Sequence, residues 1–303
     1  MIYEYHNPVL LSESIIGLDI NRDGIYVDVT FGGGGHSAEI LNNLGEKGML
    51  FAFDQDKDSL KNAIDDPRFM LINQNFKYLK NYLKFYKITK VDGIIADLGV
   101  SSHQLDTEHR GFSIRYNGDL DMRMNTDMNH SAMDIINTYQ EEELSDIFNK
   151  YGEIKNYKVI AQTICVARKK RNIKNISDLK EILSVFYTDR MWHKFFAKLF
   201  QAIRIEVNDE LNSLKVLLKD SQDVLNVGGR LVVISYHSLE DRLVKRFIKN
   251  GVFESEIEKD IYGNTATSPP FKAVNKRVIK PSYQEVSHNN RSRSARLRIA
   301  VKV

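Results

Sequence analysis

The chain has 303 residues, 42% hydrophobic and 27% charged, which is typical of a folded globular protein and excludes a disordered one. Its net charge is only +3, and Cys165 is its single cysteine, which excludes internal disulfides and a multi-cysteine zinc site, so we expect no metal. We see no signal peptide and no apolar run long enough to cross a membrane, and therefore expect a cytoplasmic protein that does not bind membranes.

A glycine-rich turn follows the first predicted strand. The segment 25–37 reads IYVDVTFGGGGHS: a β-branched run ends in Asp28, four glycines follow, and a segment with helical spacing comes next. Glycines let the backbone pass close to a ligand, and the N–H groups at a helix start can bind its polar atoms. Strand, glycine turn and helix form the opening unit of a doubly wound α/β fold.

The residues around this turn predict an adenosine-containing cofactor. Gly33, Gly35 and Ala38 fit the spacing of a dinucleotide-binding turn, and a second strand, 49–53, ends in Asp54, 19 residues after Gly35. An acid at that position binds ribose hydroxyls in NAD and in S-adenosylmethionine alike. Asp28, directly before the glycines, favours S-adenosylmethionine.

The α/β alternation continues to Asp97. We expect a short helix at 58–64, a strand at 69–72, a helix at 76–86 and a strand at 91–96 that ends in Asp97. Strands that alternate with helices indicate a mainly parallel sheet, and ligands bind beyond the carboxyl ends of such strands. Asp28, Asp54 and Asp97 should share that edge.

The alternation then stops for about a hundred residues. Segment 98–126 has no sustained period and is typical of a binding or active-site loop. Residues 131–200 are predicted to be helical: Ser131 with Asp134 forms a capping box, and Ser177 caps a later helix.

One helix in this region, 156–170, ends in a basic cluster. It places Val159, Thr163 and Val166 on one face. The cluster, 168–171, fits either the negative end of a helix or a contact with RNA.

The sheet is predicted to resume after the helical region. A long helix with Val207, Leu211, Leu214 and Leu218 on one face should be closed by Gly228 and Gly229, and a strand follows at 231–235. The next helix should be capped by Ser238 with Asp241 and have an apolar face of Leu239, Leu243 and Phe247, which puts His237 in a strand-to-helix turn at the ligand edge.

The end of the chain is basic. Residues 271–303 contain nine Lys or Arg and one acid, and 296–303 alternates as a last strand. A basic segment on an otherwise acidic chain indicates a polyanionic partner, and a folded, solvated strand is the alternative.

Eight sequence motifs follow one another along nearly the whole chain: HNPVLL (6–11), TFGGGGHS (30–37), DLGVSSHQLD (97–106), RGFS (110–113), LDMRM (120–124), FQAIRIEVNDEL (200–211), GGRLVVISYHSLEDRLVKRF (228–247) and NNRSRSARLRIA (289–300). In this order they resemble the bacterial 16S rRNA cytosine-N4 methyltransferase family (RsmH, also called MraW). One departure is His103, where the family typically has proline, so that Gln104 could be held less rigidly.

The resemblance implies a fold and an activity. The fold is an α/β, Rossmann-like class I S-adenosylmethionine-dependent methyltransferase core with an inserted all-helical domain. We place the first part of the core at 1–112, the inserted loop and substrate-recognition domain at 113–202, and the second part of the core at 203–303. The implied reaction is N4-methylation of a cytidine in the decoding centre of 16S rRNA, with the small ribosomal subunit as partner. The oligomeric state stays open.

The resemblance also implies cofactor contacts. The residues carried over by motif are Gly34, Gly35, His36, Asp54, Phe76, Asp97 and Gln104. Asp54 should bind the ribose hydroxyls, and Phe76 could pack near the adenine. Two alternatives remain: Phe76 as part of the helix core, and His36 as a support of the glycine turn.

The catalytic prediction starts from the weak nucleophilicity of the cytosine N4 amine, whose lone pair is conjugated into the ring. Many amino-methyltransferases use an Asp- or Asn-Pro-Pro-aromatic tetrad after the fourth strand, whereas this chain has Asp97-Leu98-Gly99-Val100. We therefore assign Asp97 mainly to the cofactor, with an additional contact to the amine. His237 is the candidate proton acceptor, and a structural turn histidine is the alternative.

Three arginines are predicted to bind the RNA, and two other functions remain possible for the chain. Arg123, Arg291 and Arg293 are the candidate substrate-binding residues, and a salt bridge with Asp119 or Asp121 is the alternative for Arg123. The rival functions are an NAD-dependent oxidoreductase and a non-catalytic RNA-binding factor of ribosome assembly.

Overall fold

The computed structural model describes residues 8–188, 190–254 and 268–303. The chain divides into two compact units: Met1–Gly99 with Leu211–Val303, and Val100–Glu210. The sequence placed these breaks after residues 112 and 202. His6 and Asn7 of the first motif, and residues 255–267 of the segment predicted to complete the sheet, lie outside the described residues.

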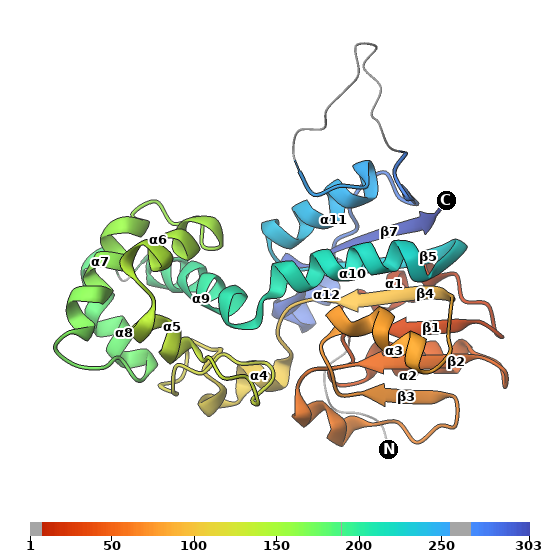
Figure 1. Cartoon of the computed structure of the whole chain (residues 1–303), viewed down its shortest axis with the longest axis horizontal. Helices are drawn as coiled ribbons and strands as arrows, with labels where there is room; N and C mark the ends of the chain where they lie inside the picture. Colours follow the sequence, from red (N-terminus) through yellow and green to blue (C-terminus); the bar gives the residue numbers. More distant parts are fainter. Residues whose placement is uncertain (1–7, 189, 255–267) are drawn as a thin grey trace, which may run out of the picture. The chain divides into compact units, whose positions relative to one another are not determined.

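In the described part of the first unit the strands form one mixed sheet (Figure 1). They are β1 (Ile25–Asp28), β2 (Met49–Phe53), β3 (Phe69–Ile72), β4 (Val91–Asp97), β5 (Leu225–Ser235), β6 (Phe271–Ala273) and β7 (Arg296–Lys302). Their order is β3-β2-β1-β4-β5-β7-β6. Strands β1 to β5 pair in parallel, whereas β7 is antiparallel to both of its neighbours.

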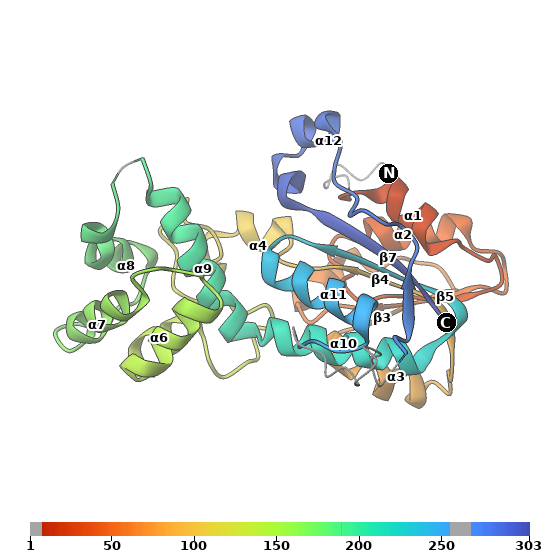
Figure 2. The same cartoon turned by 90° about the horizontal axis from the view of Figure 1, so that it is seen from above.

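Helices cover both faces of this sheet (Figure 2). Along β1, Tyr26 packs with α1 (Leu11–Leu18) and α2 (Gly35–Asn43), and the next residue, Val27, packs on the opposite face. That opposite face is covered by α3 (Leu79–Phe85), α10 (Glu210–Val224) and α11 (Ser238–Asn250). Because both faces are buried, the strands are apolar at successive positions. The predicted Rossmann-like fold is confirmed.

The polar carboxyl ends of the first strands meet at one edge of the sheet. β1 pairs with β2 on one side and with β4 on the other, so the strand order reverses beside β1. Asp28 and Asp97 end their strands, and Asp54 follows the end of β2. Ligands of open α/β sheets bind in the crevice at this kind of reversal.

Three elements of this unit differ from the sequence predictions. Residues 58–64 and the start of 76–86 form short 3₁₀ turns, η1 (Lys57–Asn62) and η2 (Phe76–Tyr78), rather than α-helix. Gly228 and Gly229 do not close α10, which ends at Val224; they lie inside β5. The pairing register shifts at this point, since Val91 pairs with Leu225 but Gly93 pairs with Arg230, and Gly228, with a φ of +85°, lies among the extra residues of β5.

Helices account for most of the regular structure described in the second unit. They are α4 (Ser102–Asp106), α5 (Ala132–Thr138), α6 (Glu141–Lys150), α7 (Tyr157–Arg168), α8 (Ile176–Leu183) and α9 (Trp192–Asn208), with short 3₁₀ turns η3 (Glu108–Arg110) and η4 (Ser184–Phe186). They bury a core of their own that includes Phe148, Ile164, Leu179 and Phe196. No described helix of either unit is long and apolar enough to span a membrane.

The helix caps follow the predictions only in part. The capping box of Ser131 with Asp134 is confirmed. α8 begins earlier than expected, because Asn175 rather than Ser177 caps it, together with Asp178. In the first unit, His237 with Glu240 caps α11 in place of Ser238 with Asp241.

Helix α7 buries a different face from the one we singled out. Its buried residues are Ile160, Ala161, Ile164 and Cys165. Val159 and Val166 are 52% and 53% exposed, so the apolar positions at that spacing face solvent.

Candidate active site

Hydrogen bonds to Asp28 stabilise the glycine turn between β1 and α2. Its carboxylate accepts hydrogen bonds from the Thr30 N–H (3.0 Å) and from the Ser37 hydroxyl (2.8 Å). The side chain is buried, and that burial raises the pKa of Asp28. Asp28 thus joins the two ends of the turn and serves as its internal support.

The four glycines do not play the same part. Gly32 and Gly34 have φ angles of +52° and +79°, a region that side chains disfavour. A Cβ at Gly35 would collide with the ring of Pro8, whereas a Cβ at Gly33 would meet nothing within 4 Å. Gly35 therefore allows the N-terminal segment to pack on α2, and Gly33 is the open position of the turn.

Asp54 fixes this turn from the end of β2. One carboxylate oxygen accepts the N–H of Gly32 (2.7 Å) and the other accepts the N–H of Asp56 (2.8 Å). Burial of the carboxyl raises the pKa of Asp54 to about 7, against these two hydrogen bonds, which lower it. Each carboxylate oxygen can accept more than one hydrogen bond, so acceptor sites remain for a ligand.

Asp97 lies at the centre of a polar cluster at the end of β4. Oδ1 accepts a hydrogen bond from the Tyr236 hydroxyl (2.8 Å), and Oδ2 lies 3.9 Å from Nδ1 of His36. The side chain is 22% exposed. Burial raises the pKa of Asp97 to about 6, while His36 and the tyrosine hydrogen bond oppose the rise.

His36 is bound at its other nitrogen as well. Nε2 lies 3.1 Å from the carbonyl oxygen of Val9, which can only accept a hydrogen bond, so Nε2 carries a proton and donates. Nδ1 is then the nitrogen that faces Asp97. These contacts agree with the alternative that His36 supports the turn, and its cofactor contact stays a prediction.

Tyr236 is the residue of this cluster that was not predicted from the sequence. Burial, followed by the charge of Asp97, raises the pKa of Tyr236 well above its usual value, so the hydroxyl stays protonated as a donor. No local sequence signal marks this contact, because it depends on sheet order: β5 lies beside β4 and Ile234 pairs with Asp97, so a residue just after β5 lies near the end of β4. Of that turn, only His237 was predicted as a site residue.

One nitrogen of the His237 imidazole is used by its own helix, and the other, Nε2, is buried without a hydrogen-bond partner among the described residues. Nδ1 accepts the N–H of Glu240 (3.4 Å), and Nε2 lies 3.2 Å from Oε1 of the same residue. The backbone N–H groups of Tyr236 and His237 also donate to the Glu240 carboxylate (2.9 and 3.3 Å). This geometry supports the structural alternative, and the role of His237 as proton acceptor stays a prediction.

Two further predicted cofactor residues have structural contacts of their own. Phe76 is half-buried and packs against the core on the face of α3 and α10. Gln104 belongs to the second unit, where its side chain is 4% exposed and accepts the N–H of Ser101 (3.1 Å) in a capping box. His103 therefore does not leave Gln104 loosely held, and the cofactor contacts of both residues stay predictions.

Arg123 is bound within its own loop. Its guanidinium donates twice to Asp121 (2.9 and 2.7 Å) and once each to the carbonyl oxygens of Thr126 (3.0 Å) and Met128 (2.7 Å). These bonds use four of the five N–H donors of an arginine. The structure thus contains the salt bridge that was the alternative to an RNA contact, with Asp121 as its partner.

We therefore expect Arg123→Ala to act mainly on stability. Removing the charged hydrogen bonds should lower the free energy of unfolding by about 2–3 kcal/mol, which urea denaturation would measure. Arg115→Ala is the matched control, because Arg115 is exposed in the same loop. A stable Arg123→Ala protein with weakened RNA binding would contradict this expectation and support the prediction that Arg123 contacts RNA.

The basic C-terminal segment is partly structural. Arg296 and Arg298 both pair with the buried carboxylate of Asp241 (3.2 and 2.7 Å). Arg293, in η5 (Asn290–Ser294), is exposed, and Arg291 is half-buried. The folded strand proposed as the alternative is present as β7, and the RNA contacts of Arg291 and Arg293 stay predictions.

The fold and this site define a class of protein. A parallel sheet with an antiparallel β7 inserted between β5 and β6, a glycine turn after β1, and acids after β2 and at the end of β4 are the arrangement of class I S-adenosylmethionine-dependent methyltransferases. Residues 4–303 match the MraW methylase family. The chain belongs to that family.

Two relatives of high sequence identity agree with this assignment. A protein of Flavobacterium johnsoniae named "Ribosomal RNA small subunit methyltransferase H" is 56% identical over 300 residues, 99% of this chain and 98% of that protein. A protein of Christiangramia forsetii with the same name is 54% identical over 303 residues, 100% of this chain and 99% of that protein. A solved rRNA methylase from Streptococcus thermophilus is 13% identical, with a TM-score of 0.44 over 100% of this chain and 99% of that one.

Proposed function

We propose that this protein methylates the RNA of the small ribosomal subunit with S-adenosylmethionine, at the N4 amine of a cytidine in the decoding centre of 16S rRNA. The observation that carries the chemical part is the pairing of Asp97 with Tyr236 beside the open glycine turn. The names of the relatives support the choice of RNA.

The site fits the cofactor. When bound, S-adenosylmethionine supplies a methyl group activated by its positive sulfonium. Gly33 leaves space beside the turn, and Asp54 keeps acceptor lone pairs for ribose hydroxyls after binding Gly32 and Asp56. The other residues proposed to hold the cofactor are Gly34, Gly35, His36, Phe76, Asp97 and Gln104.

Asp97 is the group proposed to act on the amine. A carboxylate that accepts an N–H of the amine raises electron density on the nitrogen, which otherwise donates its lone pair to the ring. Tyr236 holds Oδ1, so Oδ2 is the oxygen for the amine. One amine proton must leave as the nitrogen forms its new bond, and Oδ2 accepts it. With a pKa of about 6, Asp97 is ionised and able to accept at neutral pH.

Mass spectrometry of rRNA nucleosides tests this proposal. A strain that lacks the gene should lose N4-methylated cytidine from its small-subunit RNA. The wild-type gene should restore the modification, and a gene encoding Asp97→Asn should not. An unchanged nucleoside profile in the deletion strain would refute the reaction, and restoration by the Asp97→Asn gene would refute the role of Asp97 while leaving the reaction in place.

Arg291 and Arg293 are proposed to contact RNA phosphates. Replacing both with Ala should weaken binding of small-subunit RNA and reduce the slope of log affinity against log salt by about 0.7–0.9 for each phosphate that the variant no longer neutralises. Cofactor affinity should not change. Arg22→Ala with Lys47→Ala removes two exposed cations elsewhere and is the control. An unchanged salt slope in the Arg291/Arg293 double variant would make this segment purely structural.

A further inference from the structure

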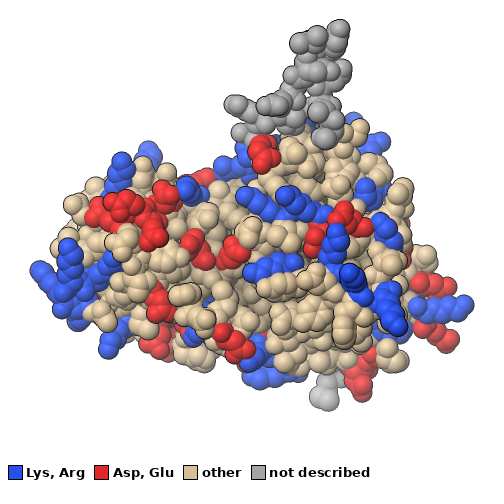
Figure 3. Space-filling model, viewed as in Figure 1, with Lys and Arg blue, Asp and Glu red and all other residues tan. Residues whose placement is uncertain are grey.

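Helix α7 and its flanking residues carry an unusual charge pattern. Residues 154–175 include no Asp or Glu and seven cations, which are Lys155, Lys158, Arg168, Lys169, Lys170, Arg171 and Lys174. The preceding helix, α6, begins with three glutamates. Figure 3 shows the result on the surface of the second unit: Lys and Arg gather around α7 and α8, and Asp and Glu gather over α6. Ordinary surfaces mix the two signs.

Two of these cations have structural roles. Arg168 donates to the carbonyl oxygens of Ile136 (2.7 Å) and Tyr139 (2.6 Å) at the end of α5. Arg171 pairs with Asp178 (2.8 Å) and lies 3.6 Å from Glu181. By contrast, within the described ranges the amino groups of Lys158, Lys169 and Lys170 form no ion pair, and all three side chains are exposed.

The helix dipole explains only part of this pattern. Cations near the C-terminus of a helix are favourable, which accounts for Arg168 and its neighbours. Lys158, however, lies in the first turn of α7, where the dipole disfavours a positive charge. A cation at the unfavourable end is better explained by an anionic partner than by the stability of the helix.

Two of these lysines, Lys158 and Lys170, lie at the two ends of one exposed row of side chains. Lys158, Gln162 and Val166 follow one another at intervals of four residues along α7, and Lys170 continues the interval two residues after Arg168, where the helix ends. With a rise of about 1.5 Å per residue, the helical part from Lys158 to Arg168 spans about 15 Å, and Lys170 lies beyond it. An extended nucleic-acid strand would present more than one phosphate along that length.

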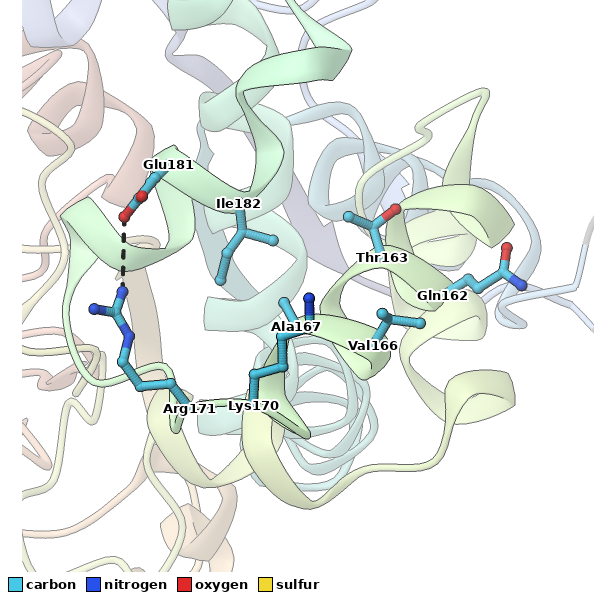
Figure 4. A pocket seen from close by; sticks show the side chains of 8 residues that line it. All are labelled: Gln162, Thr163, Val166, Ala167, Lys170, Arg171, Glu181 and Ile182. Carbon is cyan, nitrogen blue, oxygen red and sulfur yellow. Dashed lines mark ion pairs between the residues drawn. The ribbon is translucent and has the colours of Figure 1, made fainter.

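This row borders an open groove between α7 and α8 (Figure 4). The groove has a volume of about 550 Å³ and is lined by Gln162, Thr163, Val166, Ala167, Lys170, Arg171, Glu181 and Ile182. Val166, Ala167 and Ile182 give it an apolar wall and Gln162 adds an amide. The charges of Arg171 and Glu181 offset each other across the groove, which leaves Lys170 as its unpaired cation. Such a surface suits a sugar or base with a phosphate at the Lys170 end.

We infer that this row of α7, with the adjoining groove, binds backbone phosphates of the substrate RNA. The inference rests on the proposed function, which supplies RNA as the partner. It adds a binding surface within residues 158–182 to the arginines of the C-terminal segment. Since phosphate contacts carry no sequence information, the surface contributes affinity and orientation rather than the choice of base.

A triple substitution tests the inference. Lys158→Gln, Lys169→Gln and Lys170→Gln together remove three exposed charges and should leave the fold intact, which circular dichroism would verify. Binding to purified 16S rRNA should weaken, and the slope of log affinity against log salt should fall by about 2–3 if each lysine contacts one phosphate. Affinity for S-adenosylmethionine, measured by calorimetry, should equal that of the wild type.

The matched control removes the same charge elsewhere. Lys47, Lys84 and Lys87 are exposed in the first unit, and their triple change to Gln should leave the salt slope near that of the wild type. Equal slopes for the two triple variants would overturn the inference, because only net charge would then matter. Weakened binding to intact subunits with unchanged binding to naked rRNA would also overturn it, in favour of a ribosomal protein as partner. A wild-type enzyme that binds this RNA without methylating it would instead refute the proposed function and leave the α7 surface standing.

Discussion

Asp97→Asn is expected to lower the rate of methyl transfer by about 10²–10⁴-fold, the usual contribution of a positioned proton acceptor. The amide oxygen can still accept the hydrogen bond from Tyr236, so the side chain should keep its place. The variant loses the negative charge and the ability to take a proton. Single-turnover methyl incorporation into small subunits measures the effect. Asp92→Asn, at the opposite end of the same strand, is the matched control.

The pH dependence gives an independent test of Asp97. Its pKa is raised to about 6, so lowering the pH through 6 converts the accepting carboxylate into a neutral acid, and the wild-type rate should fall. The hydrogen bond from Tyr236 lowers this pKa. Tyr236→Phe should therefore shift the fall to higher pH, while a purely structural tyrosine would change stability and leave the midpoint where it was.

The same measurements decide between Asp97 and His237. His237→Asn keeps an oxygen that can accept the N–H of Glu240 and so cap α11. If His237 acts only as that cap, the variant should retain most of the wild-type rate. A decrease as large as that of Asp97→Asn would identify His237 as the proton acceptor. A wild-type rate for Asp97→Asn would exclude Asp97 from that role.

Asp54→Ala should raise the dissociation constant for S-adenosylmethionine about tenfold or more, because hydrogen bonds to a charged group contribute roughly 1.5–3 kcal/mol. The substitution removes the proposed acceptor of the ribose hydroxyls and also releases the N–H groups of Gly32 and Asp56. Titration calorimetry measures the change. Asp65→Ala, an exposed acid before β3, is the matched control.

The protonation of Asp54 sharpens this test. Its pKa of about 7 means that the ionised form, which accepts best, predominates only above neutral pH. Wild-type affinity should therefore decrease as the pH falls through 7, and the Asp54→Ala protein should lose that dependence. Unchanged affinity in Asp54→Ala at pH 8 would remove the residue from the cofactor site.

The features that could be predicted from the sequence are those that depend on residues close together in the chain. Strand ends at Asp28 and Asp97 and the glycine turn follow from local patterns, because apolar runs, acids and glycines are read within a few residues. The shared edge of the three acids follows from parallel topology alone. Caps were less certain: His237 replaced Ser238 as the cap of α11 because a neighbouring residue offered an equivalent acceptor.

Contacts between distant segments could not be predicted in this way. Tyr236 meets Asp97 only because β4 and β5 are neighbours, which is a matter of sheet order. The sequence of α7 offers two apolar stripes, one with Val159 and Val166 and one with Ile160 and Ile164, and the core of the second unit decides that the latter is buried. The bond of Arg123 with Asp121 is by contrast a local contact, and the sequence offered it as one of two alternatives.

The glycine turn depends on residues from both ends of the chain. Pro8 packs on Gly35, Val9 binds His36, and the N–H of Leu10 donates to the carboxylate of Glu285, 275 residues away (2.8 Å). During synthesis the turn itself emerges early, but the segment that braces it has no acceptor until α12 (Tyr283–His288) has been made. Contacts of such sequence separation form late, because they must wait for the intervening chain. A nascent chain therefore gains this brace of the glycine turn only after Glu285 has been synthesised, however early the turn itself has emerged.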